Sequence, residues 1–170
     1  IRQTLGLPQN AVLVGVFANL IRRKRNHMLV DIIAGVTQTS NGDPVYGLMC
    51  GGPAEPLDTL FAEKIERYGL QARILQPGFV RPSDVWMAAC DIIITISNTT
   101  AHLAGALGKE VFLMLPHAAG RLWYWQADRK DSLWYPKVRL FRQRRPGDWA
   151  EVIQRVCTAI AKPSPQTRRR

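Results

Sequence analysis

The stretch Asp91-Ile92-Ile93-Ile94-Thr95-Ile96-Ser97-Asn98-Thr99-Thr100-Ala101-His102-Leu103-Ala104-Gly105-Ala106-Leu107-Gly108 decides the fold of this chain. Its first part is an apolar, β-branched run, which predicts a strand buried on both faces. The small and hydroxylated residues that follow predict a tight turn into the N-terminus of a helix. A buried strand that leads directly into a helix is typical of a parallel α/β sheet.

The start of this predicted helix has the chemistry of an anion site. The N–H groups and the positive dipole end of a helix N-terminus favour negative charge. The side chains from Ser97 to Thr100 add groups that hydrogen-bond phosphate oxygens. If the turn is open to solvent, a nucleotide diphosphate or another phosphate ligand fits the pattern. The alternative is an ordinary N-cap on a buried helix, since Ser, Thr and Asn commonly cap helices.

Short β-rich runs alternate with helical periodicity along the whole chain. The predicted strands are residues 11–18, 45–50, 72–75, 91–96, 111–115 and 138–141. The predicted helices are residues 26–37, 57–68, 83–89, 99–107 and 148–161. Strands and helices at this spacing predict an α/β fold, a Rossmann-like parallel sheet with helices on both faces.

Length and composition indicate one globular domain. The chain has 170 residues, of which 46% are hydrophobic and 21% charged. We expect a domain over residues 1–162 and a disordered basic tail over residues 163–170. No apolar run reaches the roughly 18 residues of a membrane span, and no secretory signal is apparent. Because the chain begins with Ile1 rather than Met, we expect it to be an excised domain or a fragment.

The three cysteines have no paired spacing. Cys50, Cys90 and Cys157 therefore argue against a disulfide framework and against a zinc site. His27 and His117 have no acidic or Cys neighbours in the sequence, so we expect no metal. A reducing compartment, the cytoplasm, is the simplest location.

The net charge of +10 points to anionic partners. The run Arg22-Arg23-Lys24-Arg25 follows the first predicted strand and precedes a helix, where cations oppose the helix dipole. A bound polyanion would resolve that conflict. The alternatives are a solvated surface loop and nucleic-acid binding through the basic clusters.

A second strand ends in Gly51-Gly52-Pro53, which allows a backbone to pass close to a ligand. The alternative is a simple strand-ending turn. The carboxyl ends of parallel strands share one edge of a sheet, so this turn, the basic run and residues 97–100 should lie together. The glycine-rich fingerprints of NAD enzymes and P-loop NTPases are absent.

His102 and a group of aromatic residues complete the candidates. His102 is able to donate to a phosphate or shuttle a proton, or it is a satisfied helical histidine. Aromatic residues between 123 and 135 lie among arginines, where they would stack on bases or sugars or form a hydrophobic lid.

Several of these segments resemble the C-terminal, donor-binding domain of GT-B glycosyltransferases. Residues from about 5 to 94 are similar to glycosyltransferase family 4. The matching pieces are residues 14–20, 24–27, 48–53, 77–78 and 88–91. Residues 97–108 resemble the phosphate-binding segment of the family 9, heptosyltransferase-like group. Residues 121–125, 131–136, 141–143 and 147–149 resemble the ends of tetratricopeptide-repeat proteins that carry such a domain.

The resemblance implies a function and a set of contacts. It implies that the chain binds a nucleotide-sugar donor, with Lys24 on the diphosphate and Thr99, Thr100 and His102 on its phosphates. The acceptor site would lie in an N-terminal domain outside this chain, so the fragment would be inactive alone, and no metal or other cofactor is expected. The acidic Glu-x7-Glu pair of family 4 is absent, which leaves open a non-catalytic interaction domain with a decayed nucleotide site.

Overall fold

The computed structural model describes residues 1–19, 24–39, 42–52, 57–117 and 122–162. The strands are β1 (Val12–Phe17), β2 (Val45–Cys50), β3 (Ile74–Gly78), β4 (Ile92–Ile96), β5 (Glu110–Leu115) and β6 (Val138–Arg142). The helices are α1 (Met28–Thr39), α2 (Leu57–Arg67), α3 (Ser83–Ala89), α4 (Thr99–Ala106), the short 3-10 helix η2 (Trp123–Trp125) and α5 (Trp149–Ala161).

The six strands form one parallel sheet in the order β3-β2-β1-β4-β5-β6. This is the strand order of a doubly wound Rossmann fold, so the predicted fold class is confirmed. The strand order reverses between the neighbours β1 and β4. At such a switch point the connections leave toward opposite faces and open a crevice at the carboxyl ends of the strands.

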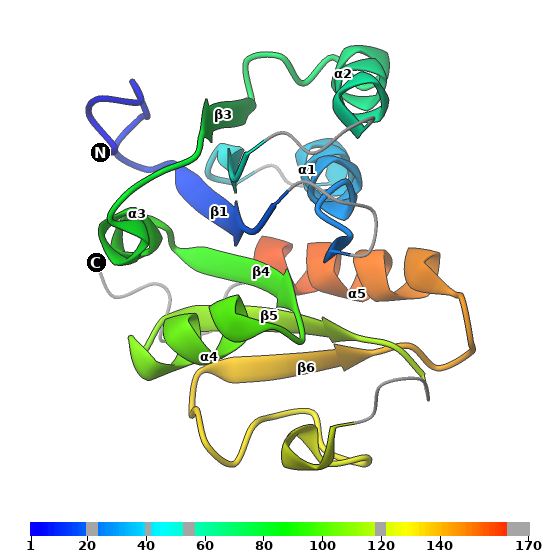
Figure 1. The fold of residues 1–170 in the computed structure, drawn as a ribbon. Coiled ribbons are helices and arrows are strands. Elements are labelled where there is room, and N and C mark those ends of the chain that lie inside the picture. The colour runs from blue at the N-terminus through cyan, green and yellow to red at the C-terminus, as the bar shows by residue number, and fades with distance from the viewer. Residues whose placement is uncertain (20–23, 40–41, 53–56, 118–121, 163–170) are drawn as a thin grey trace.

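Helices cover both faces of the sheet. Figure 1 shows α1, α2 and α5 on one face and α3 and α4 on the other. Because successive side chains of a strand point to opposite faces, each face has its own core. Val14 and Ile92 pack in the first core and Leu13 and Ile93 in the second, all at most 2% exposed.

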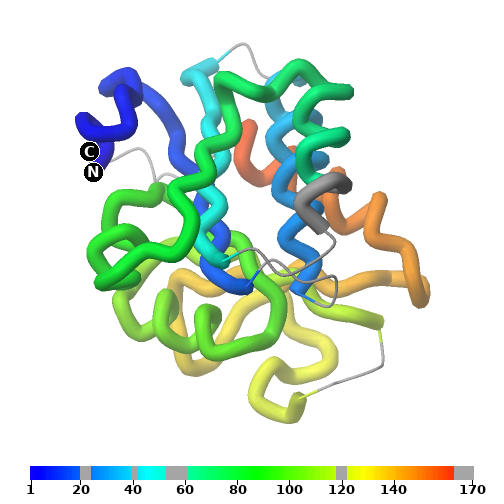
Figure 2. Tube along the Cα trace, turned by 45° about the horizontal axis from the view of Figure 1, so that its top comes forward, coloured from blue at the N-terminus to red at the C-terminus, as the bar shows by residue number. Residues whose placement is uncertain are grey.

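The last helix packs beside the first. Figure 2 shows α5 alongside α1, although the two are far apart in the sequence. They approach closely at Gly35, where a Cβ atom would lie 2.9 Å from the Cys157 sulfur. Asp148 caps α5, since its side chain accepts from the Glu151 N–H.

The amino ends of β1 and β4 are held together by Asp91. Its Oδ2 accepts from the Leu13 N–H at 2.7 Å and from Arg2 at 3.0 Å. Arg2 also donates to the carbonyls of Ala11 and Ala89. These contacts fix the amino ends of the two central strands side by side.

The observed elements follow the predicted ones closely, with shifts in α1, which runs over Met28–Thr39 and not over residues 26–37, and in β3. β3 runs over Ile74–Gly78 and not over residues 72–75. A register irregularity between Leu48 and Cys50 lets the strand continue through Pro77, which an edge strand tolerates. Among the helices in the described ranges, none is long and apolar enough to cross a membrane. The tail expected over residues 163–170 lies outside the described residues.

Candidate functional site

A cavity of about 330 Å³ opens at the switch point. Its described lining comes from residues 17–19 at the end of β1, 50–51 at the end of β2, 79–83 after β3, Met87 in α3 and 99–103 at the start of α4. Gly51 after β2 and Thr99 and Thr100 after β4 meet at this cavity, as the sequence predicted for a shared carboxyl edge. The site therefore lies where doubly wound sheets bind their ligands.

One hydrogen bond joins the two central elements at this cavity. The Thr100 hydroxyl donates to the carbonyl oxygen of Phe17 at 2.6 Å. The start of α4 is thereby tied to the end of β1. Thr100 lines the cavity, but its hydroxyl proton is already used by the fold.

The beginning of α4 combines a cap with an open face. Asn98 is the N-cap, and its side chain accepts from the Ala101 N–H and from the Thr95 hydroxyl. Thr99, the first helical residue, is exposed and lines the cavity. The cap raised by the sequence is therefore present at Asn98, and the phosphate contact of Thr99 stays a prediction.

The two glycines after β2 have different environments. A Cβ atom at Gly51 would lie 2.0 Å from the carbonyl oxygen of Ala18, so this position requires glycine. Gly51 lines the cavity, and its N–H donates to the Gly78 oxygen. A Cβ at Gly52 would meet no atom within 4 Å. The sequence predicted that this turn passes close to a ligand. At Gly51 the close neighbour is the backbone at the end of β1.

The basic run is described only in part. Arg22 lies outside the described residues. Lys24 is half-buried in the turn before α1 and is not among the described residues that line the cavity. The turn is fixed by Asn26, which is 3% exposed and donates to the carbonyls of Ala18 and Asn19 at 3.2 and 3.1 Å.

Ser97 and His102 face an aromatic cluster rather than the cavity lining. The Trp125 indole N–H donates to the Ser97 hydroxyl at 2.9 Å. The His102 ring stacks on Trp125 with centroids 5.1 Å apart, and its Nδ1 lies 3.1 Å from the Tyr135 hydroxyl. Both residues therefore contact the aromatic residues between 123 and 135, for which the sequence left open a hydrophobic lid or a stacking surface. Their predicted phosphate contacts stay predictions.

Sequence reasoning missed the segment after β3. Phe79 is 64% exposed, and the Arg81 guanidinium lies 5.0 Å from the centre of its ring. Both residues line the cavity, as does Ser83. The available signal was Pro77-Gly78, which ends a third strand at the same edge of the sheet.

Metal ligands do not gather at this site. Within the ranges that the structure describes, no three His, Cys, Asp or Glu side chains are placed to hold a metal ion. The expectation that donor binding needs no metal stays a prediction.

Comparison with known proteins gives few sequence relatives. No family model matches the chain. Protein FlbA of Caulobacter vibrioides is 36% identical over 73 residues, which are 43% of this chain and 12% of FlbA.

Solved structures show a clear likeness in fold. Anabaena HepE, in a crystal structure with UDP and glucose, has a TM-score of 0.70 at 23% identity, over 98% of this chain and 42% of HepE. WaaG, a glycosyltransferase involved in lipopolysaccharide biosynthesis, has a TM-score of 0.65 at 15% identity, over 92% of this chain and 40% of WaaG. The pneumococcal O-GlcNAc transferase GtfA, in complex with UDP and GlcNAc, has a TM-score of 0.67 at 13% identity, over 94% of this chain and 30% of GtfA. The chain thus spans less than half the length of each.

Proposed function

We propose that this chain is the donor-binding part of a GT-B glycosyltransferase and binds a nucleotide-sugar at the switch point between β1 and β4. One observation carries the proposal: the cavity at the carboxyl ends of the strands is bordered by the first turn of α4, with the Thr99 side chain exposed there. The likeness in fold to HepE and GtfA, both crystallised with UDP, supports it.

The diphosphate occupies the end of the cavity at α4 in this proposal. The dipole of α4 and the Thr99 hydroxyl stabilise its negative charge. Thr100 acts as a positioning residue through its bond to Phe17. Lys24 and Arg22 supply positive charge from the segment that follows β1, and His102, a residue of α4, connects this helix to the aromatic cluster through Trp125 and Tyr135.

The nucleoside lies toward the segment after β3. The exposed ring of Phe79, with Arg81 stacked against it, offers a flat surface on which a base is able to stack. Gly51 lines the cavity between the two ends of the donor. The cavity volume of about 330 Å³ lies within the range of small-molecule sites.

Glycosyl transfer from such a donor requires stabilisation of the departing nucleotide diphosphate. Fixed dipoles and cations provide that stabilisation without a metal. The acceptor site and the catalytic base belong to another part of the protein, an N-terminal domain or a repeat region. We therefore expect the isolated chain to bind the donor but not to transfer the sugar. We place the protein in the cytoplasm, in keeping with its three free cysteines.

A second candidate is a non-catalytic interaction domain of a tetratricopeptide-repeat protein. A specific observation favours it: the Ser97 hydroxyl is bound by Trp125 and the Thr100 hydroxyl by Phe17, so two predicted phosphate contacts are used by the fold itself. A decayed nucleotide site would retain such internal contacts and lose affinity for the donor.

Calorimetric titration with UDP, GDP and ADP distinguishes the two candidates. We expect one nucleotide to bind at millimolar concentration or below, and Thr99→Val and Lys24→Ala to weaken it. Arg67→Ala, which removes an exposed charge in α2 far from the site in sequence, is the matched control and should leave affinity unchanged. Absence of heat with all three nucleotides, from a protein that is folded by circular dichroism, would favour the interaction domain.

A further inference from the structure

A second and larger groove lies at the opposite end of the sheet order from β3. Its volume is about 580 Å³, and its described lining comes from the edge strand β6, the last helix α5 and the segment 127–130. It shares no described lining residue with the cavity at the switch point. Seven of its lining side chains are cationic, and one, Asp128, is anionic.

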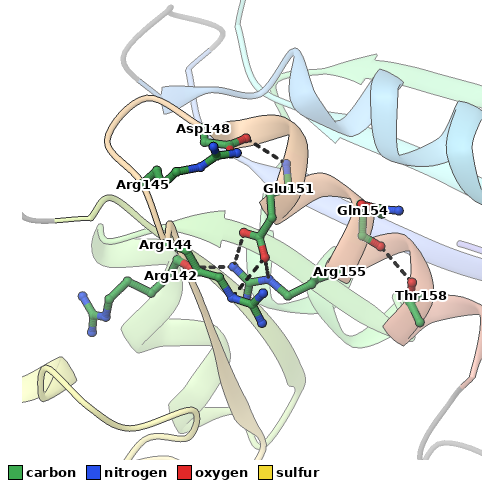
Figure 3. Close-up of polar contacts among 8 residues, drawn as sticks. All are labelled: Arg142, Arg144, Arg145, Asp148, Glu151, Gln154, Arg155 and Thr158. Carbon is green, nitrogen blue, oxygen red and sulfur yellow. Dashed lines mark hydrogen bonds and ion pairs between the residues drawn. The ribbon is translucent and has the colours of Figure 1, made fainter.

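The cations at the floor of this groove are held in place by the protein. Arg155 donates to both carboxylate oxygens of Glu151, at 2.6 and 2.8 Å, and to the carbonyl of Arg142 (Figure 3). Arg144 also pairs with Glu151, at 3.3 Å. Arg142 itself donates to the carbonyl of Gln126 at 2.7 Å. The guanidinium groups are thus fixed in direction before any ligand arrives.

Another arginine is fixed by aromatic rings. The Arg139 guanidinium lies 4.8 Å from the centre of the Phe112 ring and 5.4 Å from that of Phe141. Its ion pair with Glu110 is long, at 3.7 Å. Arg139, which lines the groove, is therefore held by two aromatic rings and one long ion pair.

The rim adds further positive charge. Lys130 and Lys162 are exposed, and among the described residues neither has an ion pair within 4.0 Å. Arg129 pairs with Asp131, an exposed contact of little strength. Cations therefore outnumber the carboxylates around the groove. Arg139, Arg142 and Arg155 are half-buried, and water screens their charges less than at an open surface.

We propose that this groove is a second anion site, which binds a phosphate or diphosphate group. A fixed guanidinium group donates two parallel hydrogen bonds to phosphate oxygens, and a lysine ammonium adds positive charge with little directional preference. The groove is too large for a lone carboxylate and within the range of small-ligand sites. The site is independent of the nucleotide-sugar site, and the phosphate comes from a soluble ligand or from a lipid headgroup.

Amide NMR titration with inorganic pyrophosphate at physiological salt tests the proposal. We expect saturable shifts at residues 127–130, 139–144 and 155–162, with an affinity read separately from that of residues 17–19 and 99–103. Thr99→Val should leave the groove affinity unchanged, so that the two sites are distinguished. Absence of groove shifts at millimolar pyrophosphate would contradict a soluble phosphate ligand.

Two double variants that remove equal charge distinguish specific binding in the groove from non-specific electrostatic attraction to the whole protein. The double substitution Lys130→Ala and Lys162→Ala should weaken groove binding by about tenfold, as expected for lost contacts to a charged ligand. Arg67→Ala with Lys137→Ala removes the same charge from two exposed positions outside the groove, and should weaken binding by less than about twofold. Equal losses in the two double variants would overturn the proposal.

Two further experiments, vesicle sedimentation and oligonucleotide binding, identify the molecule that carries the phosphate. Sedimentation with phosphatidylcholine vesicles that contain phosphatidic acid, compared with phosphatidylcholine alone, reports a lipid headgroup. Vesicle binding that depends on Lys130 and Lys162 supports the site with a lipid as its ligand. Binding of a single-stranded oligonucleotide, with no response to either pyrophosphate or vesicles, would overturn it in favour of a nucleic-acid surface.

Discussion

The Thr100 hydroxyl and the Phe17 carbonyl oxygen, 2.6 Å apart, connect α4 to β1 across the point where the strand order reverses. These residues are far apart in the sequence but meet at the floor of the candidate site. Because the connection is internal, a change at Thr100 acts on the shape of the site. A change at the neighbouring Thr99, which is exposed, acts on the ligand directly.

Thr100→Val should therefore lower both stability and nucleotide affinity. Valine has nearly the shape of threonine but no donor for the Phe17 oxygen, and the loss of one hydrogen bond costs about 1 kcal/mol. Thr99→Val should weaken nucleotide binding and leave the free energy of unfolding unchanged. Denaturant unfolding and calorimetric titration of both variants measure the two effects. A stability loss at Thr99 equal to that at Thr100 would contradict this division of roles.

Gly51→Ala should be strongly destabilising, whereas Gly52→Ala should not. The new Cβ at Gly51 would lie 2.0 Å from the Ala18 oxygen, so the ends of β1 and β2 must separate. Overpacking of this kind costs about 1–3 kcal/mol. At Gly52 the added methyl group meets open space, and we expect a change within about 0.5 kcal/mol. Thermal unfolding of the two variants tests this prediction. Equal melting temperatures would contradict it, because they would show that the ends of β1 and β2 separate at little cost in free energy.

The fold and one edge of the site were predictable because they depend on local pattern. The apolar run before Ser97 and the small residues after it predict a buried strand and a helix, and strand–helix alternation predicts the parallel sheet. Convergence at the carboxyl edge then follows from topology, which brings Gly51 and Thr99 to one cavity.

The remaining contacts depend on distances that no local pattern encodes. The hydrogen bond from Trp125 to Ser97 joins residues that are far apart in the sequence, and hydrophobic periodicity does not predict where a residue in an irregular segment lies. Phe79 and Arg81 reach the cavity because β3 continues through Pro77 to Gly78, a register set by its pairing with β2. The basic groove likewise combines β6, α5 and a loop, so the sequence indicated basic clusters but not the groove that they line.

The three cysteines should be unreactive while the protein is folded. Burial raises the pKa of Cys50 and of Cys90 to about 12 and that of Cys157 to about 11. Since the thiolate is the reactive form, labelling with a disulfide reagent at neutral pH should be slow in the native state and fast in denaturant. Rapid labelling of even one thiol in the native protein would contradict the packing around it.

The carboxylates at the start of α5 should make stability depend on acid pH. A hydrogen bond from Arg155 lowers the pKa of Glu151 below its ordinary value of 4.5. The Glu151 N–H and then Arg145 lower that of Asp148 below 3.8. A carboxyl whose folded pKa is depressed stabilises the protein above its unfolded pKa, and this contribution is lost as the pH falls through the folded pKa.

Glu151→Gln should remove part of that dependence. At neutral pH the variant should melt below the wild type, because Arg144 and Arg155 lose their partner. As the pH falls from about 4.5 through the lower folded pKa of Glu151, the wild type loses this contribution and the two melting temperatures should converge. Glu66→Gln, at an exposed position in α2, is the control and should follow the wild type at every pH. A constant difference in melting temperature between Glu151→Gln and the wild type across this range would contradict a pKa of Glu151 that is lower in the folded protein than in the unfolded protein.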